Sequence, residues 1–147
     1  MKKVDLNRVA GEFEMISTDT HVYYNKETGE FDFYMDSMMD SEYDNSEKFE
    51  DGNWIAGPDI DEIDEYDMMV DFACTVEDPR AKELFSIALD GKGAFRRFRD
   101  VLDRTNLSEE WYAFRSNAYV RVARRWCIGN DIPFDDPEED ADSDEKE

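Results

Sequence analysis

The chain has 147 residues, of which 40% are hydrophobic and 14% aromatic, and its formal net charge is −22. This length and apolar content can bury one hydrophobic core, which excludes a chain that is disordered throughout. No stretch approaches the roughly 20 apolar residues of a membrane span, and the first residues lack the apolar stretch of a secretion signal. We therefore expect a cytoplasmic protein with no membrane association, in which residues 1–134 form a single α+β domain.

The N-terminal part of the chain predicts a short helix followed by a β-hairpin. The apolar residues of the helix recur at helical spacing after Asp5, which can cap it; they are Leu6, Val9, Ala10 and Phe13. Aromatic and β-branched residues then fill His21–Tyr24 and Glu30–Tyr34, the two strands of the hairpin. Alternation in the second strand predicts that Phe31 and Phe33 share one buried face.

Two acidic segments lack apolar periodicity. Residues 36–53 and 135–147 are rich in acidic side chains, so they bury too little apolar surface to offset the entropy of ordering the chain. We expect a solvated acidic connection over the first segment and a disordered acidic tail over the second. After the connection, Trp54–Ala56 forms either a third strand or an extended segment.

Helical periodicity from residue 59 onward predicts three to four helices packed on the hairpin. The first begins at Asp59 or Asp61, where acids in the first turn suit a helix N-terminus. Its apolar stripe consists of Ile60, Ile63, Tyr66, Val70 and Ala73. The next begins at Asp78–Pro79, a cap followed by a first-turn proline, and ends near Gly91. Its stripe consists of Ala81, Leu84, Phe85, Ala88 and Leu89.

The last two predicted helices combine arginines with aromatic residues. One follows Gly93, and its apolar face consists of Ala94, Phe95, Phe98, Val101 and Leu102. The other begins at Ser108, a cap followed by acids, and runs to about Cys127. Its stripe consists of Trp111, Phe114 or Arg115, Ala118, Tyr119, Val122 and Trp126. Since only a few residues join these helices, we expect an antiparallel pair.

Positive charge is concentrated in the C-terminal helices. Residues 1–75 carry 5 Lys and Arg against 21 Asp and Glu, residues 76–130 carry 11 against 8, and residues 131–147 carry 1 against 10. Such a distribution bears on partners and solubility more than on the fold. The candidate binding residues are Lys92, Arg96, Arg97, Arg99, Trp111, Tyr112, Arg115, Arg121, Arg124 and Arg125.

The arginines have three interpretations. They can pair with the chain's own acids, in surface ion pairs that contribute roughly 0 to 1 kcal/mol each. They can dock an anionic protein partner, with Trp111, Tyr112 or Trp126 as aromatic anchors. They can contact nucleic-acid phosphates, which the net charge of −22 opposes at long range. We expect a protein partner and keep nucleic acid as an alternative; the sequence does not specify the oligomeric state.

Two further alternatives are binding of an anionic small ligand and imitation of nucleic acid by the protein's own carboxylates. The turn Gly91-Lys92-Gly93 precedes a helix and can hold an anionic small ligand beside Arg96 and Arg97, as a binding protein or an enzyme would. Conversely, a row of carboxylates on one helix can imitate nucleic-acid phosphates and occupy a basic groove on another protein. That row consists of Asp61, Glu62, Asp64, Glu65, Asp67 and Asp71.

Catalytic and metal-binding groups are sparse. His21 is the only histidine, and Cys74 and Cys127 fall at predicted buried helical positions, where a reducing compartment leaves them as thiols. No cluster of Cys and His has the spacing of a zinc site. We therefore expect a non-catalytic binding protein, and we assign no catalytic residue, no metal and no cofactor.

One run of residues carries a family resemblance. Ala88–Leu102, ALDGKGAFRRFRDVL, followed by Trp111–Arg115, WYAFR, resembles the signature of a bacterial family known as uncharacterised protein family 0158. The hairpin around Tyr24 and Thr28–Glu30, the segment Tyr66–Met69 and the acidic connection fit the same pattern. The resemblance implies a small bacterial protein and implies no activity, cofactor or catalytic residue.

Overall fold

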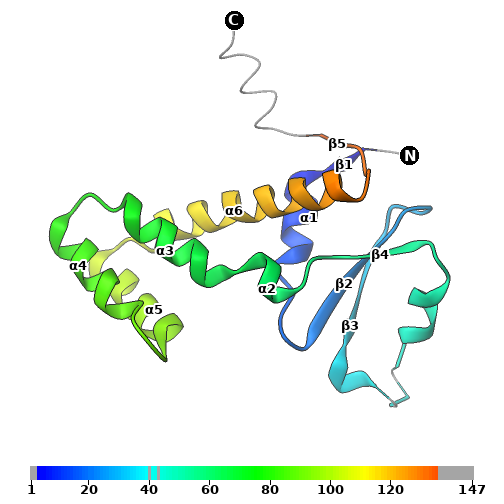
Figure 1. The fold of residues 1–147 in the computed structure, drawn as a ribbon, viewed down its shortest axis with the longest axis horizontal. Coiled ribbons are helices and arrows are strands. Elements are labelled where there is room, and N and C mark those ends of the chain that lie inside the picture. The colour runs from blue at the N-terminus through cyan, green and yellow to red at the C-terminus, as the bar shows by residue number, and fades with distance from the viewer. Residues whose placement is uncertain (1–2, 40, 43, 136–147) are drawn as a thin grey trace, which may run out of the picture. The chain divides into compact units, whose positions relative to one another are not determined.

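The computed structural model of the protein describes residues 3–39, 41–42 and 44–135, and it has the expected α+β class (Figure 1). Its contacts group into two compact units. The sheet unit comprises Met1–Ile63 and Tyr119–Glu147, and the helical unit comprises Asp64–Ala118. The sequence predicts one domain over residues 1–134, whereas the contacts of the chain divide it into these two units. The acidic tail predicted from residue 135 lies, after Asp135, outside the described residues.

Strands and helices are mixed in the N-terminal part of the chain, and five helices follow one another from residue 60 to residue 129. The strands are β1 (Val4–Asp5), β2 (Thr20–Asn25), β3 (Phe31–Met35), β4 (Trp54–Ala56) and β5 (Phe134–Asp135). Two 3-10 turns, η1 (Asp36–Met38) and η2 (Ser46–Glu50), lie between β3 and β4. The helices are α1 (Leu6–Phe13), α2 (Ile60–Ile63), α3 (Glu65–Thr75), α4 (Pro79–Ala88), α5 (Ala94–Thr105) and α6 (Ser108–Gly129).

A three-stranded antiparallel sheet forms the centre of the sheet unit. β2 pairs with β3 on one side and with β4 on the other. The predicted hairpin is thus confirmed, and the segment expected as a strand or an extended stretch is the third strand. Asn25 closes the hairpin loop, because its Oδ1 accepts hydrogen bonds from two backbone N–H groups of the loop at 2.8 and 3.0 Å.

Aromatic rings from α1 and α6 cover one face of this sheet. Trp126 meets Phe13 and Tyr24 edge to face, with ring centroids 5.1 and 5.8 Å apart. Its indole N–H donates a hydrogen bond to the carbonyl oxygen of Ala56 in β4 at 2.8 Å. The parallel pair of β1 with β5 also joins the two ends of the described chain. The sheet unit is therefore completed only by residues that follow the helical unit in sequence.

The segment 36–53 packs against the opposite face. Where the sequence predicts a solvated connection, the described residues of this segment include the two 3-10 turns. Phe49 stacks on Tyr23 with ring centroids 4.1 Å apart and meets Trp54 edge to face at 5.1 Å. Lys48 forms an ion pair with Asp32 of β3. One aromatic residue and one cation thus anchor η2 in a segment whose acidic composition predicts a lack of structure.

The same segment explains a reversal of burial in β3. Phe33 pairs directly with Val22, so it lies on the face of β2 that α6 covers, as the alternation predicts. Phe33 is nevertheless exposed and Tyr34 is buried. Tyr34 lies on the face that the segment 36–53 covers, where Asn45 donates a hydrogen bond to the carbonyl oxygen of Phe33 at 3.3 Å. Alternation of apolar residues along β3 does not predict that residues of the segment 36–53 cover the second face of the sheet.

Three helices, α4, α5 and α6, pack around one phenylalanine of α3. The ring of Phe72 lies edge to face with four other rings. The centroid distances are 6.0 Å to Phe85 of α4, 6.2 Å to Phe98 of α5, and 5.5 Å to both Trp111 and Phe114 of α6. Edge-to-face pairs contribute about 0.5–1.5 kcal/mol each beyond the area they bury. This aromatic cluster is the core of the helical unit.

A break at Asp64 divides the helix that spacing predicts over residues 60–73 into α2 and α3. Asp64 has a φ of 54°, a left-handed conformation, and its side chain caps α3 by accepting a hydrogen bond from the backbone N–H of Asp67 at 3.1 Å. The break shifts the phase of the apolar stripe, so Tyr66 is exposed. The buried residues of α3 are Met68, Met69, Phe72 and Ala73. The carboxylates expected on one helix are consequently divided between two helices that belong to different units.

We expect Phe72→Ala to lower the free energy of unfolding of the helical unit by about 3–5 kcal/mol, because it removes a buried ring that four other rings contact. Urea denaturation followed by circular dichroism measures the change. Phe95→Ala is the matched control, since its ring is exposed and its loss should cost less than about 0.5 kcal/mol. Equal losses in the two variants would contradict the packing described.

Candidate functional site

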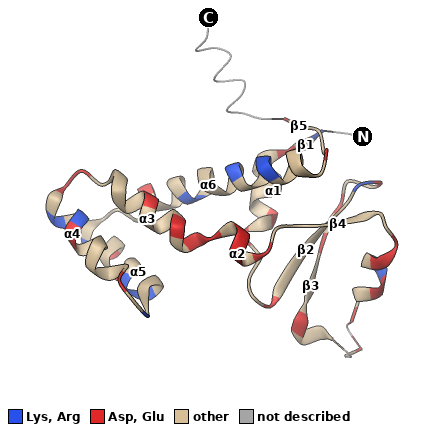
Figure 2. Ribbon diagram, viewed as in Figure 1, with Lys and Arg blue, Asp and Glu red and all other residues tan. Residues whose placement is uncertain are grey.

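The candidate binding residues fall into two sets, one on each unit. Lys and Arg lie on α4, α5 and α6, and Asp and Glu gather around the break between α2 and α3 (Figure 2). The helical unit holds Lys92, Arg96, Arg97, Arg99, Trp111, Tyr112 and Arg115, and the sheet unit holds Arg121, Arg124 and Arg125. In the helical unit, several candidates line one groove.

Arg97 binds the turn that precedes its own helix. Its Nε donates to the carbonyl oxygen of Ala88 at 3.0 Å and its Nη2 to that of Asp90 at 2.5 Å, while Nη1 donates to that of Lys92. Gly91 and Gly93 have φ of 80° and 78°, which lets the turn direct these carbonyl groups toward the guanidinium. Because the turn offers carbonyl oxygens to a cation, its geometry fits a cap on α4 better than an anion site.

We expect Arg97→Met to lower the free energy of unfolding by about 2 kcal/mol, because several backbone carbonyl groups lose a charged donor. Arg97→Lys should recover little of this loss, since a single ammonium group cannot match the planar fork of a guanidinium. Arg96→Met serves as the control, because Arg96 is exposed on the same helix. Thermal denaturation of the three variants tests the assignment, and a rescue by lysine would refute it.

The groove between α5 and α6 brings together four of the sequence candidates. We call it the aromatic groove; it has a volume of about 190 Å³ and is lined in part by Phe95, Arg99, Trp111, Tyr112, Arg115 and Glu65. Phe95 and Tyr112 are 55% and 62% exposed, whereas Trp111 is only 7% exposed and belongs to the core. Spacing predicts Phe95 on the buried face of α5, and this is wrong, because its ring is exposed in the groove. Two rings therefore stand open to solvent in one groove.

Charge in the aromatic groove is partly neutralised. Arg115 donates from Nε to Glu65 Oε1 at 2.6 Å, and both side chains are half-buried. This pair is an instance of the first interpretation, in which arginines pair with the chain's own acids. Arg99 is exposed, and none of the described carboxylates forms an ion pair with it. The groove thus offers one available guanidinium between two exposed aromatic side chains.

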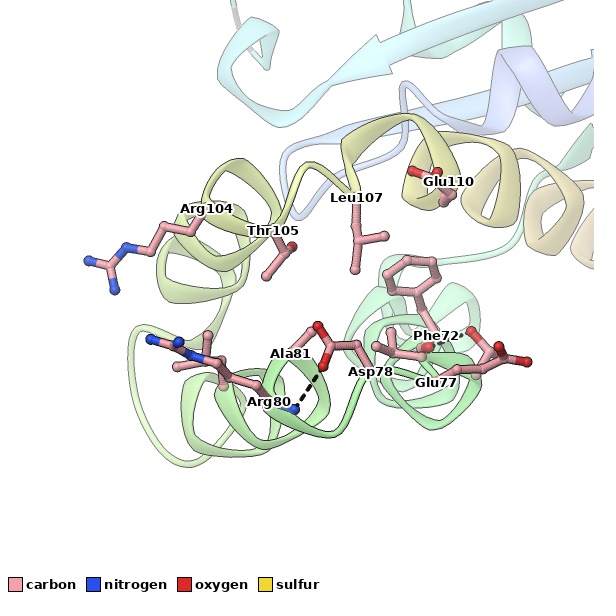
Figure 3. A pocket seen from close by; sticks show the side chains of 12 residues that line it. Phe72, Glu77, Asp78, Arg80, Ala81, Arg104, Thr105, Leu107 and Glu110 are labelled. Atoms are coloured by element: carbon pink, nitrogen blue, oxygen red, sulfur yellow. Dashed lines mark hydrogen bonds between the residues drawn. The ribbon is translucent and has the colours of Figure 1, made fainter.

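A larger cavity of about 840 Å³ opens at another place on the helical unit (Figure 3). Its apolar lining consists of Phe72, Val76, Ala81, Leu84 and Leu107. Arg80 and Arg104 lie on one side of it, and Glu77 and Glu110 lie on the other (Figure 3). Asp78, which also lines the cavity, caps α4 by accepting a hydrogen bond from the N–H of Arg80 at 3.1 Å.

These charged residues are absent from the sequence candidates, although a signal for them exists. The start of α4 and the end of α5 are each recognisable from their caps, and helices joined by a short turn run antiparallel. That arrangement places Arg80 and Arg104 on the lining of one cavity despite their separation in the sequence. A search confined to clusters of basic residues along the chain overlooks such a pair.

None of the residues considered for catalysis lines either cavity. His21 Nε2 lies 3.0 Å from Asp36 Oδ1 on the surface of the sheet unit. Cys127 is fully buried, and burial raises the pKa of its thiol to about 11, whereas Cys74 is exposed, contrary to the burial expected from the sequence. Within the described ranges, no group of three or more His, Cys, Asp or Glu residues has an arrangement that could hold a metal ion.

We expect a maleimide to modify Cys74 in the folded protein and Cys127 only after unfolding. Because the pKa of Cys127 is about 11, its thiol keeps its proton in the folded protein at about pH 9, and it should stay unmodified there as well. Mass spectrometry of native and urea-unfolded samples counts the labels. Rapid addition of two labels to the native protein would contradict the burial of Cys127.

Comparison of the chain with protein-family models, with curated proteins and with solved structures finds no match. The resemblance to uncharacterised protein family 0158 therefore stays a prediction. In the part of the chain that the structure describes, no helix has both the length and the apolar character needed to cross a bilayer.

Proposed function

We propose that the protein is a non-catalytic binding protein whose aromatic groove docks a segment of a protein partner. The observation that carries the proposal is the placement of Phe95 and Tyr112, both largely exposed, beside Arg99 in one groove. Aromatic residues and arginine are the types most enriched where interfaces gain their binding energy. Trp111 also lines the groove and packs against Phe98 in the core, so the groove that holds the two exposed rings is lined in part by a core residue.

The groove favours a partner segment with an acidic residue next to a large apolar one. A carboxylate can take the two-pronged hydrogen bonding that the guanidinium of Arg99 offers. An aromatic or aliphatic side chain beside it would cover Phe95 and Tyr112, whose exposed area is then removed from water. Glu65 is already engaged by Arg115, so it competes only weakly for the same guanidinium.

The charge of the whole chain favours a protein segment over a nucleic acid. At physiological ionic strength, charges interact over about 8 Å, so a single carboxylate in the groove responds mainly to the local arginines. A polyanion extends beyond that distance and meets the field of a chain with net charge −22. Two cysteines that form no disulfide support a reducing, cytoplasmic location for this interaction.

Selection of phage-displayed random peptides on the protein tests the proposal. We expect the enriched peptides to carry Asp or Glu next to an aromatic or large aliphatic residue. Arg99→Glu and the double variant Phe95→Ala, Tyr112→Ala should each weaken binding of a selected peptide by about tenfold or more, as measured by isothermal titration calorimetry.

Arg96→Glu is the matched control, since it makes the same change of charge on α5 outside the aromatic groove. It should bind the selected peptide as the wild type does. If the selected peptides bind all variants equally, the groove is not the site. If no peptide is enriched but a single-stranded oligonucleotide binds in a manner that Arg99→Glu abolishes, nucleic acid replaces protein as the partner.

A further inference from the structure

We infer that a cavity in the sheet unit binds a small organic monocarboxylate through the hydroxyl group of Tyr24 and the guanidinium group of Arg8. This hairpin cavity has a volume of about 340 Å³ and is lined by residues of β1, α1 and the hairpin of β2 and β3. The inference does not depend on the aromatic groove, which belongs to the helical unit. It rests on one buried hydroxyl group that forms no hydrogen bond with a described residue.

Tyr24 carries this hydroxyl group. The residue is only 2% exposed, and it lines the hairpin cavity. Its ring packs on those of Phe31 and Trp126, at centroid distances of 4.9 and 5.8 Å. Among the described residues, none forms a hydrogen bond with the hydroxyl group. Since buried polar groups in proteins almost always have a hydrogen-bond partner, this group indicates a partner from outside the chain.

Arg8 brings a positive charge to the same cavity. Its guanidinium carbon lies 5.7 Å from the centroid of the Phe31 ring, which packs on Tyr24. None of the described carboxylates forms an ion pair with Arg8. Burial raises the pKa of Tyr24, Cys127 raises it further, and the charge of Arg8 opposes both effects. The hydroxyl group therefore keeps its proton at neutral pH and can donate it in a hydrogen bond.

The other polar groups of the cavity are engaged. Asp5 caps α1 with its carboxylate, and Lys3 lies 3.7 Å from a carboxylate oxygen of Asp135. The backbone N–H groups of residues 27–29 in the hairpin loop already donate to Asn25. The remaining donors are the hydroxyl and guanidinium groups described above. The charge of Asp5 also opposes a ligand with more than one negative charge, so the cavity favours a monocarboxylate over a phosphate.

The rest of the lining determines the body of the ligand. Val4, Val9 and Phe31 contribute apolar surface, which a ligand with an apolar body would remove from water. The volume lies near the lower end of the range of roughly 300–1,000 Å³ that is typical of ligand pockets. A hydroxyl group and a guanidinium group together can satisfy the two oxygens of one carboxylate. These features fit a compact acid such as an aromatic carboxylate.

Titration of the full chain with benzoate, followed by two-dimensional amide NMR, tests the inference. We expect saturable shifts at the backbone amides of Arg8, Tyr24 and Gly29. Benzamide has a similar shape without the charge, and it should bind about tenfold more weakly. Tyr24→Phe and Arg8→Met should each weaken binding of benzoate by about tenfold, because each removes one of the two donors.

Each variant has a matched control. Tyr23→Phe removes a hydroxyl group from the next residue of β2, whose ring stacks on Phe49 outside the hairpin cavity. Arg121→Met removes an exposed guanidinium group of the sheet unit outside this cavity. Both controls should bind benzoate as the wild type does.

Three results would overturn the inference or its parts. If benzoate leaves these amides unchanged, the cavity is not a carboxylate site. If inorganic phosphate binds at the same amides as tightly as benzoate, the assignment to a monocarboxylate is wrong. Thermal denaturation of Tyr24→Phe should give the melting temperature of the wild type, because the hydroxyl group bonds to no described residue. A clear fall would show that the protein itself supplies the partner of this group.

Discussion

One apolar stripe on α6 has to fill two cores, and this constraint determines which residues of the helix remain for binding. Trp111 packs with Phe72 in the helical unit, and Trp126 packs with Phe13 in the sheet unit. Residues three and four positions apart share one side of a helix, and in the first turns of α6 the positions between the stripe residues, such as Tyr112 and Ala113, are exposed. Tyr112 occupies such a position next to the buried Trp111. Core and binding surface therefore alternate along the same helix.

Neighbouring arginines differ in role because of where the helix places them. Arg97 and Arg99 lie two residues apart on α5 and thus on different sides of it. The first reaches back to the carbonyl groups at the end of α4, and the second lines the aromatic groove. Arg115 is engaged by Glu65. The interpretation that arginines pair with the chain's own acids therefore holds for Arg115, whereas Arg97 binds backbone carbonyl groups instead of an acid. A count of basic residues overstates the charge available to a partner.

Local signals predicted α1, α4, α5, α6 and the hairpin, because caps and spacing act within a few residues. The break at Asp64 was not predictable, since the acids around it are also typical of a helix start. Phe95 and Cys74 were misplaced because spacing identifies a face but not how far a neighbouring helix covers it. Arg99 and Tyr112 were among the candidates, whereas the cavity residues depend on helices meeting in three dimensions.

The division of the sheet unit into two stretches of sequence has a consequence during synthesis. A ribosome completes the contiguous helical unit, Asp64–Ala118, before it delivers the last part of α6. Until Trp126 emerges, Tyr24 and Phe13 lack the ring that covers them, and the nascent hairpin exposes an aromatic surface of the kind that causes aggregation. The acids of the segment 36–53 are made together with this hairpin. Like charge opposes association, so these acids act against aggregation of unfinished sheets on neighbouring nascent chains.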